Sequence, residues 1–493
     1  MARINTNVSS LIAQNNLKRS GSDLQVRLQR LSTGLRINRG ADDPAGLIVS
    51  ERLRSEIKGL GTAIENSERA SSVISTAEGY LAEVADLLNS IKSLIVKSAN
   101  DGGVSKEEIE ANQLEIDSAI ESITRISNTA SFAGLQLLNG SLGYITSGVS
   151  SSDIAGVNIN GVQFDSDNQV AVSIEVVQSA QTGQLFLSGN TAGAAGELLS
   201  SVTIEIAGPL GVQSLTFVSG TPLSAVVAGV NLVRDTTGVS AALVDGSDQT
   251  SGVYFNSTTF GSDSFVSVKK IGQAGDFFAT YDAQGGNATN RDTGQDVRAI
   301  VNGAVATGDG TSISLNTPAL SLSVDLSQVF ATTVDGNPST FRITGGGANF
   351  QLGPSVDATQ QAGVGIQSVA ATRVGGTDID DVRFFLDSLK SGQPNSVLSD
   401  RTEQASLILD TAITEIAVLR GRLGAFERNT LQTNMNALQI GLENITSSES
   451  KIRDADFASE TARLTRAQIL QQAGTSVLAT ANTSSQNVLA LLQ

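Results

Sequence analysis

The sequence predicts a multidomain α+β protein. Paired N- and C-terminal long helices form a coiled-coil or helical-bundle core, and the central insertion is mainly β. Residues 8–35 and 458–492 place apolar side chains at helical spacing, and neither segment contains an aromatic residue or a proline. After Phe132 the chain is instead rich in Gly, Ser, Asn and Thr, with runs that alternate apolar and polar side chains as strands do. The order along the chain is therefore helical, β and helical again.

Heptad-like stripes mark both terminal segments. Leu17, Leu24 and Leu31 are seven residues apart in the first, and Leu464 and Leu478 share one track in the last. Such stripes are typical of helices that pack against a partner helix. One helix of this kind buries too little apolar surface to offset the conformational entropy lost on folding. We therefore expect both ends to be disordered or marginal in the free chain and ordered on assembly.

The N-terminal connector and the next two helices carry start signals. Asp43 can accept hydrogen bonds from the free amides of a first helical turn, and Pro44 stands where its missing N–H costs nothing. A purely structural cap and a contact role are both open for this pair. The following helix runs toward the breaker at 100–103, and Ser105 with Glu108 has the capping-box form that starts a third helix.

The middle of the chain predicts short strands. Residues 170–177, 202–206 and 312–315 alternate as strands do, with turn residues between them. One helix is expected among them, capped and opened by Thr221-Pro222 and stopped near Gly238. Helical periodicity resumes near Arg401 and marks another long helix through Ile445.

Composition restricts the chemistry. The chain has 493 residues and 40% hydrophobic content, enough for several domains with ordinary cores. It contains no Cys, His or Trp. The first two absences remove thiolate chemistry, histidine-based catalysis and most zinc sites. Any catalysis would have to rest on carboxylates, Lys, Tyr or Ser, and the sequence offers no catalytic constellation of these residues, so we expect no enzyme, no cofactor and no metal.

Charge is distributed unevenly. Most of the formal net charge of −17 lies in residues 141–400, where acids outnumber bases more than twofold. Residues 1–40 are cationic, with a lone acid, Asp23, against Arg3, Lys18, Arg19, Arg27, Arg30, Arg36 and Arg39. A nucleic-acid surface is the alternative to a solvated or channel-facing helix side. The acidic remainder and the scarcity of aromatic residues favour the second, so we expect no nucleic-acid partner.

Neither end of the sequence predicts a membrane segment. The first residues lack the apolar stretch of a Sec-type signal peptide. Ala467 to Gln493 carry no charged side chain, which is compatible with a membrane tail. However, Gln471, Gln472 and Asn482 would be costly in hydrocarbon, so we expect a helix packed against protein and no membrane insertion.

Several long motifs, in the same order at both ends, resemble the bacterial flagellins. They lie at residues 4–7, 28–38, 41–47, 98–100, 132–140, 422–425, 444–450, 452–458 and 488–492. The resemblance covers roughly residues 1–140 and 401–493. It implies three domains. These are an inner terminal-helix domain (1–40 with 456–493), a helical rod domain with a β-hairpin (41–175 with 401–455), and an outer, variable, mainly β region (176–400).

The resemblance implies a secreted, extracellular filament subunit that gives motility. Flagellins are exported unfolded by the flagellar type III apparatus and polymerise through their terminal helices, without a cleaved signal. Carried over to this sequence, the inner polymerisation residues are Val8, Leu11, Leu17, Leu24, Leu28, Leu31, Leu35, Leu464, Leu470, Val477, Leu478, Val488 and Leu492. Expected partners are copies of the same chain, the export apparatus, an export chaperone, the filament cap and the hook–filament junction proteins.

The animal receptor for flagellin reads a region that here corresponds to Leu88, Asn89, Ser90, Leu94 and Glu115. Recognised members carry a Gln-Arg pair where this chain has Asn89 and Ser90. Loss of that arginine predicts weak or absent recognition by the host receptor.

Two other functions stay open at this stage. A hook–filament junction protein shares related terminal helices, although the full set of motifs favours the filament. An enzyme or carbohydrate-binding adhesin displayed by the middle is the alternative from another class, and the sequence offers no catalytic constellation for the enzyme. Asp378, Asp380 and Asp381 suggest a calcium loop, but their spacing fits no EF-hand and favours a solvated acidic turn.

Overall fold

The computed structural model describes residues 6–100, 102–164, 169–189, 196–272, 278–379, 382–399 and 401–490. It forms two compact units. Unit 1 contains Met1–Ser72, Gln351–Gln360 and Ala425–Gln493, and unit 2 contains Val73–Phe350 and Gln361–Gly424. Both ends of the chain therefore belong to the same unit, and the predicted combination of terminal helices with a mainly β centre is confirmed.

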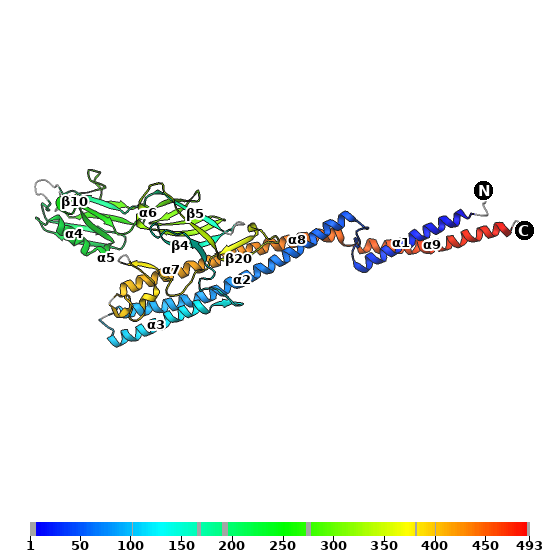
Figure 1. Ribbon diagram of the computed structural model, residues 1–493, viewed down its shortest axis with the longest axis horizontal. Coiled ribbons are helices and arrows are strands. Elements are labelled where there is room, and N and C mark those ends of the chain that lie inside the picture. The colour runs from blue at the N-terminus through cyan, green and yellow to red at the C-terminus, as the bar shows by residue number, and fades with distance from the viewer. Residues whose placement is uncertain are drawn as a thin grey trace. The chain divides into compact units, whose positions relative to one another are not determined.

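Unit 1 is built from helices at both ends of the chain. Helices α1 (Val8–Thr33) and α9 (Phe457–Ala490) lie side by side and antiparallel (Figure 1). The unit also contains the first part of α2 (Pro44–Ser98) and all of α8 (Thr433–Arg453). Residues 351–360, the tip of a β-hairpin, also belong to this unit. The side-chain amide of Asn434 on α8 donates to the Leu352 carbonyl of this tip at 2.8 Å.

The connector between α1 and α2 is ordered by short polar contacts. Gly34 ends α1 with a left-handed φ of 76°, which a residue with a Cβ adopts only at a cost. Asp43 Oδ1 accepts from the Gly46 amide at 2.9 Å, so the capping bond of α2 is present. Amides of Arg39 and Asn38 donate to Asp42 and lower the pKa of its carboxyl. This stabilisation is complete above the ordinary Asp pKa and is lost as the pH falls through the lowered value.

Three helices pack in unit 2: the later part of α2, α3 (Lys106–Thr129) and most of α7 (Thr402–Phe426). The predicted capping box is present, with Ser105 accepting from the Glu108 amide and Glu108 accepting from the Ser105 amide. The fully buried side chains between these helices include Ile74, Leu81, Val84, Leu88, Ile91, Ile116, Ile120, Ile123, Ile408 and Leu423.

The long helix predicted from Arg401 to Ile445 is not a regular α-helix throughout. A π-helical segment, Glu427–Gln432, joins α7 to α8, and Leu431 in this segment is fully buried. The segment contains no Gly or Pro. A π-helical turn accommodates one extra residue and thereby shifts which side chains face the core.

The β region contains one module inserted into another. In the first module, a sheet of order β15-β14-β5-β19-β3 packs on a sheet of order β16-β17-β18-β4 around one shared core. Its elements are β3 (Tyr144–Ser147), β4 (Ile154–Val162), β5 (Val170–Gln178), β14 (Arg298–Val301), β15 (Ala304–Val305), β16 (Thr307–Asp309), β17 (Ser312–Asn316), β18 (Leu320–Leu326), α6 (Gln328–Thr332) and β19 (Ser339–Gly346).

The second module lies between β5 and β14 in the sequence. Sheets of order β12-β6-β10-β9 and β13-β11-β7-β8 enclose its core together with α4. Its elements are β6 (Gln184–Leu187), β7 (Val202–Ala207), β8 (Val212–Phe217), α4 (Leu223–Leu232), α5 (Arg234–Thr237), β9 (Val239–Asp245), β10 (Asp248–Ser257), β11 (Phe265–Ile271), β12 (Thr280–Tyr281) and β13 (Arg291–Thr293). The expected strands at 170–177, 202–206 and 312–315 all exist.

Short elements complete the chain. Within the described residues, two-stranded sheets pair β1 with β2, β20 with β21 and β22 with β23. These strands and the 3₁₀ turns are β1 (Ser131–Phe132), β2 (Leu135–Gln136), β20 (Ala348–Gln351), η1 (Ala358–Gln360), β21 (Gln361–Val364), β22 (Thr377–Ile379), β23 (Val382–Phe384), η2 (Leu386–Leu389) and η3 (Val397–Ser399). The boundary predicted between residues 175 and 176 falls inside β5, and the three-domain division stays a prediction.

The cap expected for the helix in the second module is wrong. Pro222 occupies the N-cap position of α4 without a side-chain capping bond, and the Thr221 hydroxyl instead donates to the Val218 carbonyl. A proline has no side-chain acceptor, and Thr221 stands one residue before the N-cap position, with its hydroxyl turned toward the preceding turn. The expected stop is present, since Gly238 ends α5 with a φ of 70°.

Replacing Ser105 by Ala is expected to loosen the first turn of α3, because the Glu108 amide loses its acceptor. A lost cap costs about 1 kcal/mol, so amide exchange at residues 107–109 should become about fivefold faster in hydrogen-exchange mass spectrometry. Ser118→Ala, an exposed position within the same helix, is the control and should leave exchange unchanged or slower. Equal exchange in the wild type and Ser105→Ala would contradict this role.

Candidate assembly interface

The seam between α1 and α9 is lined by small and half-buried side chains. Ala13 and Ala467 are buried, with 6% and 1% of their surface exposed. Gly474 faces Leu17 so closely that a Cβ on the glycine would lie 3.2 Å from Leu17 Cδ1. Larger residues at these positions would separate the two helices. The residues of the seam on α9 recur every three or four positions, as in a coiled coil: Glu460, Leu464, Ala467, Gln471, Gly474, Leu478 and Ala481.

Polar contacts fix the register where the start of α1 meets the later part of α9. The side-chain amide of Asn7 donates to the Ala481 carbonyl at 2.9 Å, and the Ser10 hydroxyl donates to Asn482 Oδ1 at 2.8 Å. Asn7 also caps α1 through the Ser10 amide. The start of α1 is therefore tied to one position along α9.

A buried carboxylate holds the other end. Glu460 is 4% exposed and accepts from Arg27 at 3.0 Å and from Arg30 at 3.3 Å. Arg463 lies 3.5 Å from the same carboxylate, and Asp23 contacts Arg27 at 2.8 Å. Although burial lowers the pKa of Arg27, hydrogen bonds from its guanidinium to Glu460 and Asp23 raise it above the ordinary value. Arg27 and Arg30 thus pair with an acid of the same chain, which sequence alone left open.

The two helix breaks next to this cluster are joined by backbone hydrogen bonds. The Arg36 amide donates to the Arg453 carbonyl at 2.7 Å, and the Ala455 amide donates to the Gly34 carbonyl at 2.9 Å. Leu35 pairs with Asp454 in an isolated antiparallel bridge. The connectors that follow α1 and precede α9 therefore form one junction.

Outside the seam, α1 and α9 expose apolar side chains. Leu11 and Val477 are each 57% exposed, and Leu28 and Leu470 are 50% and 49% exposed. About half of the surface of each of these side chains therefore faces solvent. Burying them requires another surface, because water contact costs each apolar side chain free energy in proportion to its exposed area.

The predicted inner residues divide into three groups. Leu17, Leu24, Leu31, Leu464 and Leu478 are half-buried on the helices of the seam, and Leu35 is half-buried at the junction. Val8, Leu11, Leu28, Leu470 and Val477 are exposed. The side chain of Val488 and the whole of Leu492 lie outside the described residues. Their role in polymerisation stays a prediction.

Sequence reasoning missed two features of this site. Ile12 and Ile469 belong to the exposed apolar set, being 56% and 61% exposed. Glu460 was also overlooked, although it is the single acid between Phe457 and Gln493. A lone carboxylate in a segment facing a cationic helix was the available signal.

The residues expected to contact a host receptor are not all on the surface of unit 2. Leu88 is fully buried and Leu94 is 8% exposed, whereas Asn89, Ser90 and Glu115 are exposed. The two leucines pack in the helical core. A receptor can therefore reach only the three polar positions while this unit is folded.

No group of metal-binding side chains occurs in the described part of the chain. Asp378 is exposed on β22, while Asp380 and Asp381 lie outside the described residues. Among the described helices, none combines the length and the apolar character needed to cross a membrane.

A helical pair that buries little and exposes much apolar surface is typical of a structural protein that assembles with further copies or partners. The comparisons agree. The bacterial flagellin N-terminal helical region matches residues 4–142, and the C-terminal helical region matches residues 407–492. Flagellin of Salmonella rubislaw is 30% identical and B-type flagellin of Pseudomonas aeruginosa is 32% identical, each alignment covering 99% of both chains. This chain belongs to the bacterial flagellin family, whose members are structural subunits of the flagellar filament.

A solved structure of FliC from Burkholderia pseudomallei is also similar, at 15% identity over 74% of this chain and 99% of that one. Its TM-score is 0.24.

Replacing Glu460 by Gln is expected to destabilise the helix pair, because Arg27 and Arg30 lose their shared counter-charge in a partly buried site. Removing one member of a buried ion pair costs about 3 kcal/mol or more, so the temperature at which assembled filaments dissociate should fall. Adding Arg27→Gln to Glu460→Gln should cost less than the two separate effects combined. Glu443→Gln, at an exposed position on α8, is the control, and an equal shift in it would contradict the role of Glu460.

Proposed function

We propose that this chain is exported unfolded by the flagellar type III apparatus and polymerises at the growing filament through α1 and α9. The observation that carries the proposal is the exposed apolar surface of these two helices, which one copy of the chain leaves uncovered. Other copies of the same chain supply the missing contacts. The absence of Cys agrees with passage as an unfolded chain, since no disulfide has to form before or after export.

In the proposed filament, the inner domain consists of residues 1–40 with 456–493, the rod domain of 41–175 with 401–455, and the outer region of 176–400. The narrow seam explains why the free chain gains little from pairing α1 with α9. Few large side chains are buried there, and ordering two long helices costs conformational entropy. The terminal helices are thus marginal in the monomer and become stable when neighbours cover Leu11, Leu28, Leu470 and Val477.

The proposed partners follow from the same surface. Before polymerisation, an export chaperone would bind α9 in a hydrophobic groove and cover the apolar side chains of this helix. Candidate contacts are Leu470 and Val477, which are exposed, Leu478, which is half-buried on the seam, and Leu489, whose side chain lies outside the described residues. The export apparatus, the filament cap and the hook–filament junction proteins complete the set, and activation of a host receptor is expected to be weak or absent.

Replacing both Leu470 and Val477 by Asn is expected to impair polymerisation while leaving unit 2 folded. Each side chain is about half exposed, so its burial contributes about 1–1.5 kcal/mol. The critical concentration for filament growth should rise about tenfold for each single change and about a hundredfold for the pair, measured by sedimentation and electron microscopy. Thr475→Asn, an exposed polar position on the same helix, is the control.

Deletion of residues 1–33 or 457–493 should abolish filaments altogether in the same assay. Filaments of normal length from either truncated chain would refute the proposal. If the intact chain instead stops at short rings or stubs, electron microscopy would favour the junction-protein alternative.

A further inference from the structure

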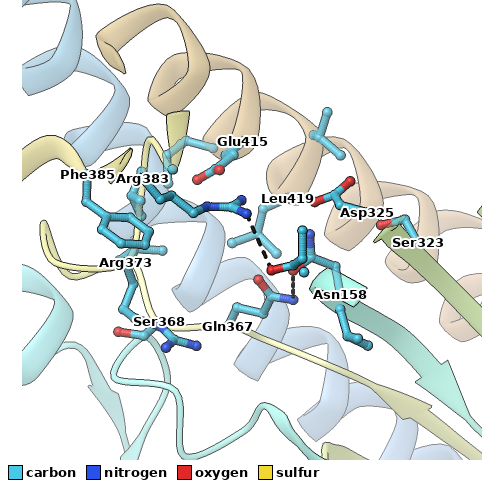
Figure 2. Close-up of a pocket in the computed structure, with 18 of the residues that line it drawn as sticks. Asn158, Ser323, Asp325, Gln367, Ser368, Arg373, Arg383, Phe385, Glu415 and Leu419 are labelled. Carbon is cyan, nitrogen blue, oxygen red and sulfur yellow. Dashed lines mark hydrogen bonds between the residues drawn. The ribbon is translucent and has the colours of Figure 1, made fainter. Parts of the chain in front are cut away.

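Unit 2 contains a cleft of about 340 Å³ where the first β module meets α7. One wall is formed by Asn158 on β4 and Asp325 on β18, and another by Glu415, Leu419 and Arg422 on α7. The loop that carries Gln367 and Arg373 closes the lower side in Figure 2, which also shows Arg383 reaching across the opening. This volume lies within the range of small-molecule sites in proteins.

The cleft concentrates positive charge within an acidic region. Arg373, Arg383 and Arg422 line it, against two carboxylates, those of Asp325 and Glu415. Both acids already accept hydrogen bonds from uncharged groups of the same chain. Asp325 accepts from the Ser312 hydroxyl at 2.8 Å, and Glu415 accepts from the Gly375 amide at 2.9 Å.

The three guanidinium groups have few hydrogen-bond acceptors, although the charge of Arg383 acts on Glu415 and partly offsets the rise in the pKa of that carboxyl that burial causes. Arg422 is half-buried and donates to the Gly365 carbonyl at 3.5 Å, and Arg383 reaches the Ala155 carbonyl at the same distance, which is the outer limit for a hydrogen bond. Arg373 has no side-chain hydrogen bond or ion pair within the described ranges. Burial lowers the pKa of Arg422, and no nearby carboxylate offsets this effect. The cleft is thus rich in donors and short of acceptors.

We propose that this cleft binds an oxyanion group, carboxylate or phosphate, held by Arg422 on the wall and by Arg373 and Arg383 at the rim. The forked donors of arginine match the paired oxygens of such groups, and a charge-assisted pair of this kind is about twice as strong as a neutral hydrogen bond. The group can come from a free small anion or from an acidic side chain of a second copy of this chain. The proposal goes beyond filament formation, and its first source does not depend on assembly.

The first experiment uses the full-length monomer. Isothermal titration with citrate and with inorganic phosphate should give saturable one-site binding of at least one of them. The dissociation constant should rise at least tenfold in Arg373→Gln/Arg422→Gln. Arg298→Gln, which removes the same charge from an exposed position on β14, should change it less than twofold. Should the double variant misfold, Arg422→Lys keeps the charge, loses the fork and should weaken binding at least threefold.

The second experiment separates the two sources. Labelling with phenylglyoxal, followed by mass spectrometry, reports the accessibility of Arg422 and Arg373 in the monomer, in the monomer with citrate or phosphate, and in filaments. Protection by a probe in the monomer assigns a free anion. Protection that occurs only in filaments indicates that the oxyanion is an acidic side chain of a neighbouring copy. This conclusion also requires that Arg373→Gln/Arg422→Gln lower the filament dissociation temperature more than Arg298→Gln does.

The proposal is overturned if neither anion binds saturably and the arginines stay unprotected in filaments. It is also overturned if neither anion binds and the arginines are protected in filaments, but the double variant lowers the filament dissociation temperature no more than Arg298→Gln does. The monomer titration stays informative if filaments never form. Failure of the cleft and failure of the polymerisation proposal are therefore distinguishable.

Discussion

The narrow seam between α1 and α9 is the constraint on which the terminal region depends. Ala13, Ala467 and Gly474 let the two helices approach closely, but they bury little apolar area. Close approach with small side chains fixes geometry and register more than it contributes free energy. Several large apolar side chains, such as Leu11 and Val477, lie outside the seam and stay exposed. A pair built in this way is specific but incomplete, and it gains stability only when another surface covers it.

Polar groups at both ends of the seam add to the specificity that close packing provides. Asn7 and Ser10 set one end, and Glu460 with its arginines sets the other. Between the Glu460 cluster and α8, the hydrogen bonds of Gly34 and Arg36 join the two connectors into one junction. A sliding of α9 along α1 would break contacts at all three places at once. The register of the pair is consequently fixed by close packing together with hydrogen bonds and charge, while its exposed apolar surface is available for assembly.

Much of the fold could be predicted because local signals agree with the final structure. Ser105 and Glu108 form a capping box, and the alternation at 170–177 becomes β5, since both depend on neighbouring residues only. The cap at Thr221-Pro222 was misjudged because a start signal does not reveal which of the two residues takes the N-cap position. The π-helical segment around Leu431 and the nesting of one β module inside the other had no local signature. The cleft was likewise invisible, because Arg373 and Arg422 are distant from Asn158 in sequence.

The sequence by itself determined the class of this protein: helical ends with heptad-like stripes, a β-rich acidic middle, no residues for histidine or thiol chemistry, and the motifs of the flagellin family. Periodicity and composition carry that information because they describe which side of an element meets water. Only the tertiary structure decided which leucines lie on the seam and which are exposed. It also decided that Arg27 and Arg30 pair with Glu460, and that three arginines share one cleft. Those outcomes depend on which distant segments pack together, and no local pattern encodes that packing.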